Sequence, residues 1–387
     1  MPGTNSIAMC AAHSHGGIAH YTYALAAALQ ASGVETEVLM YDEPEYDLTG
    51  FPHTHRVSTS LRLATSLRRR LTSPGQNLAA LLRASLGRSL VHFQWSLGPR
   101  NDRLIWPALR AAGKRIVYTA HDVVPHEPEI MPHDHCAWVY RNADAIIVHG
   151  QRLKELLLEN FPVSPAKVHV LAHGNYNFVA DTPGAWNRNS ARESLKLTDA
   201  DCAVLFFGLI REYKGLDVLI DACEEINDRG LPDGKRLKLL IAGRSFKNFW
   251  HEAGYEKRIV AANLEPAVSL HLGHIPMLDV ARFFHAADVV AIPYRRGSQS
   301  GVLQLTYSFA KAAVATRVGS LGEGPTGDLT RFVEPGDAHV LADALFELLA
   351  DPVAAVTLGA KGRRYADAEL DWAAIATGTR RIYESLR

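Results

Sequence analysis

The segment GLIREYKG, at residues 208–215, places two cations directly after an apolar run of strand length. Arg211 and Lys214 lie three positions apart, so on a helix that begins there they would share one face and clamp two phosphates between them. A solvated pair of surface cations is the alternative interpretation. The flanking glycines and the position after a strand favour phosphate binding.

A second segment, PYRRGSQSGV at residues 293–302, is a Ser/Gly-rich turn between an apolar run and a helical pattern at residues 303–310. Backbone N–H groups at such a turn and the helix dipole both favour an anion. The turn and the cation pair together predict a diphosphate site. Gly16 and Gly17, between the first apolar run and the first helical pattern, are a weaker signal, because a tight turn explains them equally well.

A third segment, TAHDVVPHE at residues 119–127, places His121 and Asp122 at the end of a predicted strand. A base and a carboxylate there could move a proton to or from a hydroxyl group, although a hydrogen-bonded loop histidine is the alternative. Histidines are dense in two stretches, but their spacing in Pro-containing loops gives no single ligand face and no cysteine joins them, so we expect no metal. These histidines are His13, His15 and His20, and then His121, His126, His133 and His135.

Apolar runs of strand length alternate with helical patterns along the whole chain, which predicts α/β architecture with parallel sheets covered on both faces. The runs are residues 6–12, 37–41, 90–93, 115–119, 145–148 and 168–171, and then 203–208, 237–242, 268–272, 289–293, 314–316 and 331–333. We predict two doubly wound, Rossmann-like domains facing across a cleft, with ligands at the carboxyl ends of the strands. The predicted parts are a domain at 1–180, a polar linker at 181–200, a domain at 201–368 and a last helix at 369–387 that crosses back to the first domain.

The composition is that of a soluble globular protein, because 47% of the 387 residues are apolar. Lys and Arg number 41 and so do Asp and Glu, so the net charge of zero argues against nucleic acid as the main partner. The start of the chain has no secretory-signal pattern and no run is long enough to span a membrane. Four scattered cysteines without a C-x-x-C pair indicate reduced thiols in the cytoplasm.

One region departs from this balance: residues 48–101 contain eight arginines and no acidic residue. Leucines interleave the arginines, so the region could form a basic amphipathic surface that contacts anionic lipid or a lipid-diphosphate acceptor. A solvated helix pair is the alternative. The arginines expected at the membrane are Arg68, Arg69, Arg70, Arg83 and Arg88.

The order and spacing of several short motifs resemble the retaining glycosyltransferases of family 4, which have the GT-B fold, over essentially the whole chain. The motifs are the glycine pair at 16–17, AHD at 120–122, HGN at 173–175, R-x-x-K-G at 211–215, IAG at 241–243, LGHIP at 272–276, AADVVAIP at 286–293 and AVATRVGSLGE at 313–323. The resemblance implies transfer of a sugar from a nucleotide-diphosphate donor, held mainly by the second domain, to an acceptor hydroxyl held mainly by the first.

Site residues follow from the resemblance by position. Arg211 and Lys214 would hold the leaving diphosphate, and His121, with Asp122 beside it, would act at the transferred sugar. The donor-binding set would be Gly16, Gly17, His173, Gly243, Arg244, His274, Ile275, Ser300, Gly301 and Val302. Such enzymes need no metal or cofactor beyond the donor substrate, because cations supply the charge stabilisation.

The chain lacks two glutamates that the family usually carries eight positions apart. Gly297 and Leu305 occupy those positions. The first glutamate usually acts near the donor sugar and the second on the ribose, so the donor and the stereochemical outcome stay open. The acceptor stays open too: a cell-surface glycan, a lipid-linked intermediate or a secondary metabolite. Two alternatives remain, a catalytically silent nucleotide-sugar-binding subunit and another GT-B reaction such as epimerisation.

Overall fold

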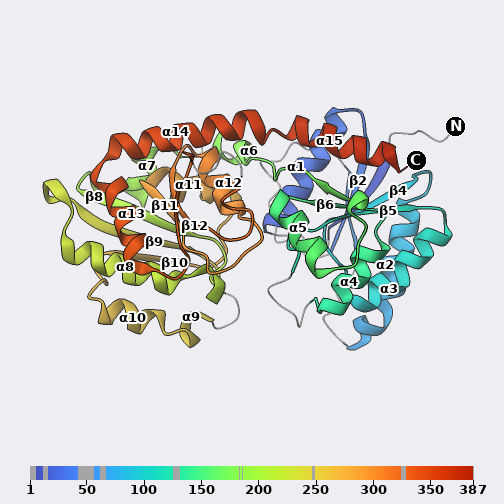
Figure 1. Ribbon diagram of the computed structural model, residues 1–387, viewed down its shortest axis with the longest axis horizontal. Helices are drawn as coiled ribbons and strands as arrows, with labels where there is room; N and C mark the ends of the chain where they lie inside the picture. Colours follow the sequence, from blue (N-terminus) through green and yellow to red (C-terminus); the bar gives the residue numbers. More distant parts are fainter. Residues whose placement is uncertain are drawn as a thin grey trace. The chain divides into compact units, whose positions relative to one another are not determined.

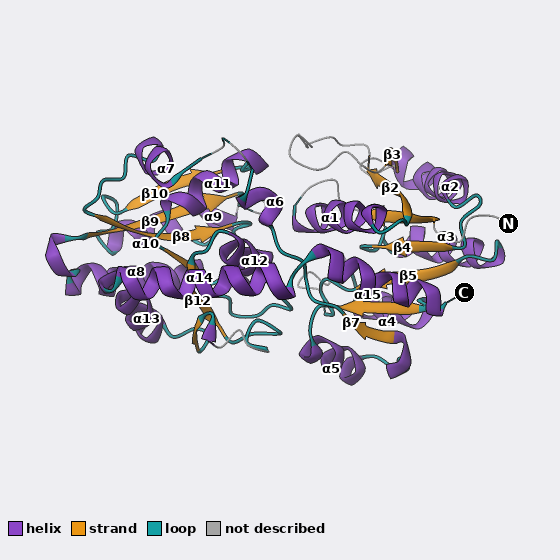
Figure 2. Cartoon of the chain, turned by 90° about the horizontal axis from the view of Figure 1, so that it is seen from above, coloured by secondary structure: helices purple, strands orange, loops and turns teal. Residues whose placement is uncertain are grey.

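The computed structural model describes residues 6–11, 16–41, 56–61, 67–124, 131–182, 184, 186–245, 249–323 and 328–386, with the side chains of 41, 56–61 and 67–73 left aside. The chain divides into two compact units (Figure 1). Unit 1 combines Met1–Gly174 with Leu370–Arg387, and unit 2 is Asn175–Glu369. Each unit is built around its own parallel sheet with helices on both faces (Figures 1 and 2).

The unit 1 sheet has seven parallel strands in the order β3-β2-β1-β4-β5-β6-β7. Its strands are β1 (Ser6–Ala11), β2 (Glu35–Tyr41), β3 (Arg56–Leu61), β4 (Leu90–Phe93), β5 (Arg115–Thr119), β6 (Ala145–Val148) and β7 (Val168–Val170). Its helices are α1 (Gly17–Ala31), α2 (Leu67–Ala84), α3 (Pro99–Ala111), α4 (His133–Asn142), α5 (Gln151–Asn160) and α15 (Trp372–Ser385), with a 3-10 turn η1 (Pro165–Lys167). Helices α1 and α15 pack together on one face, whereas α2, α3 and α4 cover the other.

Burial explains the pattern of unit 1. All residues of β4 and β6 are buried, as expected for central parallel strands covered on both faces. Strand β3 was not predicted, because its sequence RVSTSL has no apolar run. After β4, the buried Asp102 carboxylate closes the turn into α3 by accepting hydrogen bonds from Ser96 Oγ and, at 3.1 Å, from Leu97 N.

The unit 2 sheet has six parallel strands in the order β10-β9-β8-β11-β12-β13. Its strands are β8 (Asp201–Phe207), β9 (Arg236–Gly243), β10 (Val268–Leu272), β11 (Val289–Ile292), β12 (Ala312–Thr316) and β13 (Arg331–Val333). Its longer helices are α8 (Leu216–Arg229), α10 (Tyr255–Ala261), α11 (Met277–Ala286), α12 (Gly301–Ser308), α13 (Ala338–Ala350) and α14 (Pro352–Glu369). Shorter ones are α6 (Asn177–Ala180), α7 (Arg188–Ser194), α9 (Phe249–Glu252), η2 (Glu212–Lys214) and η3 (Pro232–Gly234).

The boundary between the units differs from the predicted one. The predicted linker at 181–200 contains α7, which Asn187 begins with a capping box and which packs against α11. The buried Arg192 side chain donates to the carbonyls of Ala286 and Asp201 and so fixes this segment to unit 2. The polar composition of this segment therefore belongs to a short capped helix and not to a linker. The boundary between the two units falls between residues 174 and 175. The last helix, α15, belongs to unit 1.

Candidate active site

The predicted cation pair does not share the face of one helix. Arg211 is extended (φ −145°, ψ 159°), Lys214 ends the 3-10 turn η2, and α8 begins only at Leu216. Gly215 lies between η2 and α8 in the left-handed conformation (φ 67°), so the 3-10 turn ends before the α-helix begins. The expectation of a shared helix face is thus wrong, and the two cations lie on a strand-to-helix turn.

Tyr294 brings Lys214 next to the Ser/Gly turn. The Lys214 ammonium donates to the Tyr294 hydroxyl at 2.5 Å and lies 3.7 Å from the centre of its ring. Ser300 Oγ donates to the same hydroxyl at 3.1 Å. Tyr294 is buried, and burial raises the pKa of its phenol well above the ordinary value, so the oxygen stays a neutral acceptor. Sequence reasoning missed this residue, although it directly follows the strand's proline in PYRRGSQSGV.

An ion pair also links the turn at residues 208–215, which we call the cation turn, to the Ser/Gly turn at residues 293–302. Arg295 donates to both carboxylate oxygens of Asp217, at 2.6 and 2.5 Å, and its backbone N–H donates to the carbonyl of Tyr213 at 2.7 Å. Burial alone would raise the pKa of Asp217, but the hydrogen bonds and charge of Arg295 hold it below its ordinary value. The cation turn and the Ser/Gly turn therefore form one structural piece at the carboxyl edge of the sheet.

The first turn of α12 supplies amide donors at the same place. Ser300 is the N-cap residue, and its side chain accepts a hydrogen bond from Leu303 N at 3.3 Å. Gly301 and Val302 are the first two residues of α12, and no hydrogen bond between described residues uses their backbone amides. The N–H groups of a first helical turn and the helix dipole stabilise an anion. Lys214, Tyr294 and Ser300 thus surround a position suited to a phosphate group.

Close backbone packing aligns the neighbouring strand ends. A Cβ atom on Gly243 would lie 1.8 Å from the carbonyl oxygen of Gly208, so the ends of β8 and β9 meet at a distance that only glycine allows. Ile210 N donates to Arg244 O at 2.9 Å, and Gly273 N donates to Gly243 O at 3.0 Å. The expected nucleotide-pocket residues follow these strand ends: Arg244 and His274 are exposed, and Ile275 is half-buried.

Gly215 offers a test of this packing, because Gly254 is its matched control. Both residues are helix N-caps with nearly equal φ, 67° and 68°, but a Cβ on Gly215 would lie 2.0 Å from Pro293 O whereas Gly254 has open space. We expect Gly254→Ala to cost about 1 kcal/mol of unfolding free energy from backbone strain alone. Gly215→Ala should cost about 2 kcal/mol more and weaken binding at the predicted diphosphate site, since it displaces the turn that holds Lys214. Urea unfolding and calorimetry measure both effects; equal losses in the two variants would contradict the close packing.

The two positions that lack the family glutamates offer no carboxylate. Leu305 is buried in α12, and Gly297 is half-buried beside the Gly319 turn, where a Cβ on Gly319 would lie 2.1 Å from Gly297 O.

The remaining predicted residues lie in unit 1. Gly16 is the N-cap of α1 with φ 79°, Gly17 begins that helix, and His121 and Asp122 follow β5. His173 is buried, and its Nδ1 donates to the carbonyl of Gly174 at 2.9 Å. The predicted site residues therefore fall into two sets, each at the carboxyl edge of its own sheet.

Arg88 does not belong to a lipid-facing surface, contrary to the prediction. Its side chain is only 11% exposed and lies 3.0 Å from Glu37 and 3.5 Å from Glu35. Both acids belong to β2, outside the acid-free stretch at residues 48–101, so the composition of that stretch gave no sign of these ion pairs. Arg83 is exposed on α2, whereas the side chains of Arg68, Arg69 and Arg70 lie outside the described residues.

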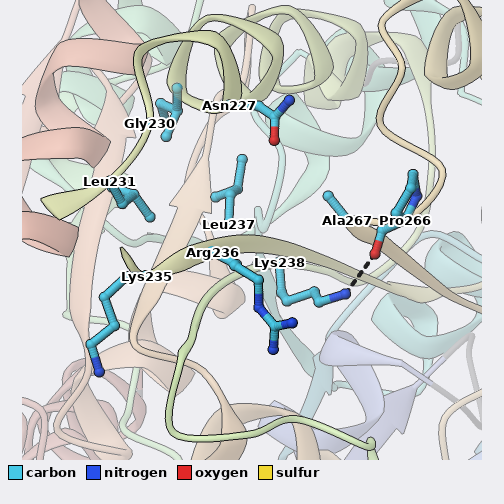
Figure 3. A pocket seen from close by; sticks show the side chains of 10 residues that line it. Asn227, Gly230, Leu231, Lys235, Arg236, Leu237, Lys238, Pro266 and Ala267 are labelled. Carbon is cyan, nitrogen blue, oxygen red and sulfur yellow. Dashed lines mark hydrogen bonds between the residues drawn. The ribbon is translucent and has the colours of Figure 1, made fainter. Parts of the chain in front are cut away.

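A hollow of about 270 Å³ lies at the other edge of the unit 2 sheet (Figure 3). Arg236 and Lys238, at the start of β9, and Pro266, just before β10, line it. Strand β9 has eight residues, so this hollow is about 20 Å from Gly243 at the strand's other end. It is therefore separate from the candidate site.

The described part of the chain contains no group of three or more His, Cys, Asp or Glu side chains placed to hold a metal ion. His13, His15 and His126 lie outside that part. None of its helices combines the length and apolarity needed to cross a bilayer. The four cysteines are buried free thiols.

Comparison with solved structures identifies the fold. The chain superposes on sucrose-phosphate synthase from Thermosynechococcus elongatus with a TM-score of 0.78, 22% identity and 99% of each chain covered. It superposes on Anabaena HepE in complex with UDP and glucose with a TM-score of 0.77, 17% identity and coverage of 98% of this chain and 99% of that one. Two parallel α/β units with this arrangement define the GT-B class.

Sequence comparison then places the chain in a family. The model for "Glycosyltransferase Family 4" matches residues 15–174, and that for "Glycosyl transferases group 1" matches residues 201–351, so the chain belongs to the family 4 type of glycosyltransferases. D-inositol 3-phosphate glycosyltransferase from Corynebacterium aurimucosum is 30% identical over 260 residues, 62% of this chain and 57% of that protein. The chain spans a little over half the length of the curated relatives it matches.

Proposed function

We propose that this chain transfers a sugar from a nucleotide-diphosphate donor to an acceptor hydroxyl, with retention of configuration at the anomeric carbon. The contact of Lys214 and Ser300 with the Tyr294 hydroxyl carries the proposal, because it gathers a cation and a helix N-terminus around one anion position. Family membership and the UDP and glucose named in the HepE complex support it. UDP-sugars are accordingly the first donors to test.

In the proposed mechanism, the glycosyl–phosphate bond breaks while Lys214 and Arg211 stabilise the charge that develops on the leaving diphosphate. The first-turn amides of α12 cap the same group, so the chain's own donors supply the stabilisation. Arg244, His274 and Ile275 would contact the nucleotide, and Gly16, Gly17 and His173 the remaining parts of the donor. His121, with Asp122 beside it, would act at the transferred sugar.

The acceptor is assigned only by class. The curated relative is named for D-inositol 3-phosphate, so soluble polyol phosphates belong in the first acceptor panel beside lipid-linked diphosphates. A lipid-linked acceptor would fit contact of Arg68, Arg69, Arg70 and Arg83 with an anionic membrane surface, without Arg88.

The alternative is a catalytically silent nucleotide-sugar-binding subunit, which the absence of carboxylates at Gly297 and Leu305 favours. Incubation with a panel of nucleotide sugars, with and without acceptors, separates the two by product chromatography. Transfer or donor hydrolysis supports the enzyme, isomerised donor indicates epimerisation, and binding without turnover of any donor supports the silent subunit.

Replacement of His121 by alanine tests its assigned role. We expect the turnover number to fall far more than UDP affinity, because the residue is assigned to the sugar and not to the phosphates. His169→Ala, on the edge strand β7, is the control and should leave both quantities unchanged. An equal loss of UDP affinity in His121→Ala would show that the histidine holds structure instead.

A further inference from the structure

Three histidine rings meet at the carboxyl edge of the unit 1 sheet. His121 follows β5, His149 follows β6 and His173 follows β7. Tyr21 of α1 packs against all three, with ring centroids 4.8, 5.0 and 5.2 Å away. All four side chains are buried, with His149 the most exposed at 8%. Only His121 and His173 carry a role in the proposed function.

The backbone determines which nitrogen of His149 carries a proton. Its Nδ1 lies 3.1 Å from the carbonyl oxygen of Leu171. A carbonyl oxygen only accepts, so Nδ1 must be the protonated donor. Burial, with a smaller effect of His173, lowers the pKa of His149 to about 3, so the ring is neutral near pH 7 and its Nε2 is an acceptor.

This acceptor faces His121. His149 Nε2 lies 3.3 Å from His121 Nδ1, so the contact is a hydrogen bond only if His121 Nδ1 carries the proton. The other nitrogen, His121 Nε2, lies 3.3 Å from Gln94 Oε1. A carboxamide presents either its oxygen or, after rotation, its NH₂ group. Gln94 can therefore accept from a protonated Nε2 or donate to an unprotonated one, whereas His149 can only accept.

We propose that His149 is a positioning residue that keeps a proton on His121 Nδ1 and thereby makes His121 Nε2 the nitrogen that gains and loses a proton. The inference rests on the proposed function, in which His121 acts at the transferred sugar. A histidine that exchanges protons in catalysis needs its second nitrogen held by a partner that selects the tautomer. Here a second histidine does so, and the Leu171 carbonyl orients that histidine in turn.

The buried histidines and tyrosines around the pair keep their neutral forms from about pH 6 to about pH 8. Burial lowers the pKa of His92 to about 3 and that of His173 to about 4, so both are neutral there. Burial raises the phenol pKa values of Tyr21 and Tyr383 well above their ordinary value. Tyr21 from α1 and His173 after β7 contact the pair directly. His92 from β4 contacts Gln94 and the Tyr383 hydroxyl of α15, and Asp122 is the next residue after His121.

The first test needs no activity. Imidazole ¹⁵N shifts of the full-length protein should show His149 protonated on Nδ1 throughout this pH range, and neutral His121 also protonated on Nδ1. In His149→Phe, which keeps a ring but removes the acceptor, His121 should shift to the Nε2-protonated tautomer. His149→Gln places a carboxamide oxygen near the former Nε2 and should restore the Nδ1 tautomer. Nε2-protonated His149 in the wild type, or an unchanged His121 tautomer in His149→Phe, would overturn the proposal.

The second test is kinetic. We expect His149→Phe to lower kcat roughly 10- to 100-fold with little change in donor KM, and His149→Gln to recover most of the loss. The pH profile of kcat should change in His149→Phe and return in His149→Gln. Equal losses in both variants would contradict the proposal. If the wild type turns over no donor, the proposed function fails, while the ¹⁵N spectra still decide the tautomer.

Discussion

Replacement of Lys214 by alanine is expected to slow sugar transfer roughly 30- to 1,000-fold, which corresponds to about 2–4 kcal/mol of transition-state stabilisation. The reason is geometric: the Lys214 ammonium and Ser300 Oγ both donate to the Tyr294 hydroxyl, which brings the cation to the turn where the leaving diphosphate would gather charge. The rate decrease in Arg211→Ala should lie in the same range. Because both side chains are only half-buried and lie outside the core of unit 2, we expect the fold to survive either substitution.

Lys235→Ala is the matched control for Lys214→Ala. Lys235 is also a lysine of unit 2, but it lies just before β9, at the amino edge of the sheet, and donates to the carbonyl of Asp199 at 2.7 Å. Single-turnover rates and UDP affinity, measured on both variants, should change only for Lys214→Ala. Full activity in both Lys214→Ala and Arg211→Ala would remove the assignment of the diphosphate site.

Tyr294→Phe separates the charge of Lys214 from its placement. The variant keeps the ring under the ammonium group but removes the hydroxyl that Lys214 and Ser300 share. A smaller rate loss than in Lys214→Ala is therefore expected. A loss of rate as large as that of Lys214→Ala would indicate that the hydroxyl contributes more than placement.

The second large effect concerns acid stability, because unit 1 holds three histidines that burial keeps neutral. Burial lowers the pKa of His92 and His149 to about 3 and that of His173 to about 4. In the unfolded chain a histidine titrates near pH 6.5, so below that pH the unfolded state binds more protons and gains stability. The stability of the folded state is therefore unaffected by the protonation of these histidines above about pH 6.5. It is lost progressively as the pH falls toward the pKa values that the histidines have in the folded protein.

The loss of folding free energy between pH 7 and pH 5 should be large enough to unfold unit 1. Between pH 7 and pH 5 each histidine costs on the order of 1.5–2 kcal/mol, or roughly 5 kcal/mol for the three, which is comparable to the stability of a whole domain. Urea unfolding at several pH values, followed by tryptophan fluorescence, measures it. Trp106 and Trp138 report on unit 1, whereas Trp250 reports on unit 2.

His92→Gln provides the control for acid stability. Glutamine cannot take up a proton, so the pH dependence of the unfolding free energy of unit 1 should become shallower by about a third. Its absolute stability at pH 7 should also fall, because His92 lies 2.7 Å from the Tyr383 hydroxyl and 2.8 Å from Thr119 Oγ1. An unfolding free energy of unit 1 that stays constant from pH 7 to pH 5 would contradict buried neutral histidines.

The sequence by itself determined most of the architecture. Apolar runs such as 90–93, 115–119 and 145–148 coincide with β4, β5 and β6, because central parallel strands are buried on both faces and must be apolar along their length. The order of the elements, with the family motifs at the ends of the runs, led to the GT-B fold that the solved structures confirm. It also identified the Lys214 turn and the Ser300 turn as separate candidates.

Tertiary structure alone decided how those candidates combine. Lys214 and Tyr294 are 80 residues apart, and His92 and Tyr383 are 291 residues apart, so no local pattern records either contact. For the same reason the sequence did not reveal the ion pairs of Arg88 with Glu35 and Glu37. Those acids belong to β2, which comes close to Arg88 only when the sheet is formed. Local periodicity reports which side chains are buried in one element. Which elements become neighbours depends on strand pairing and helix packing, and these decided that His149 would select the tautomer of His121.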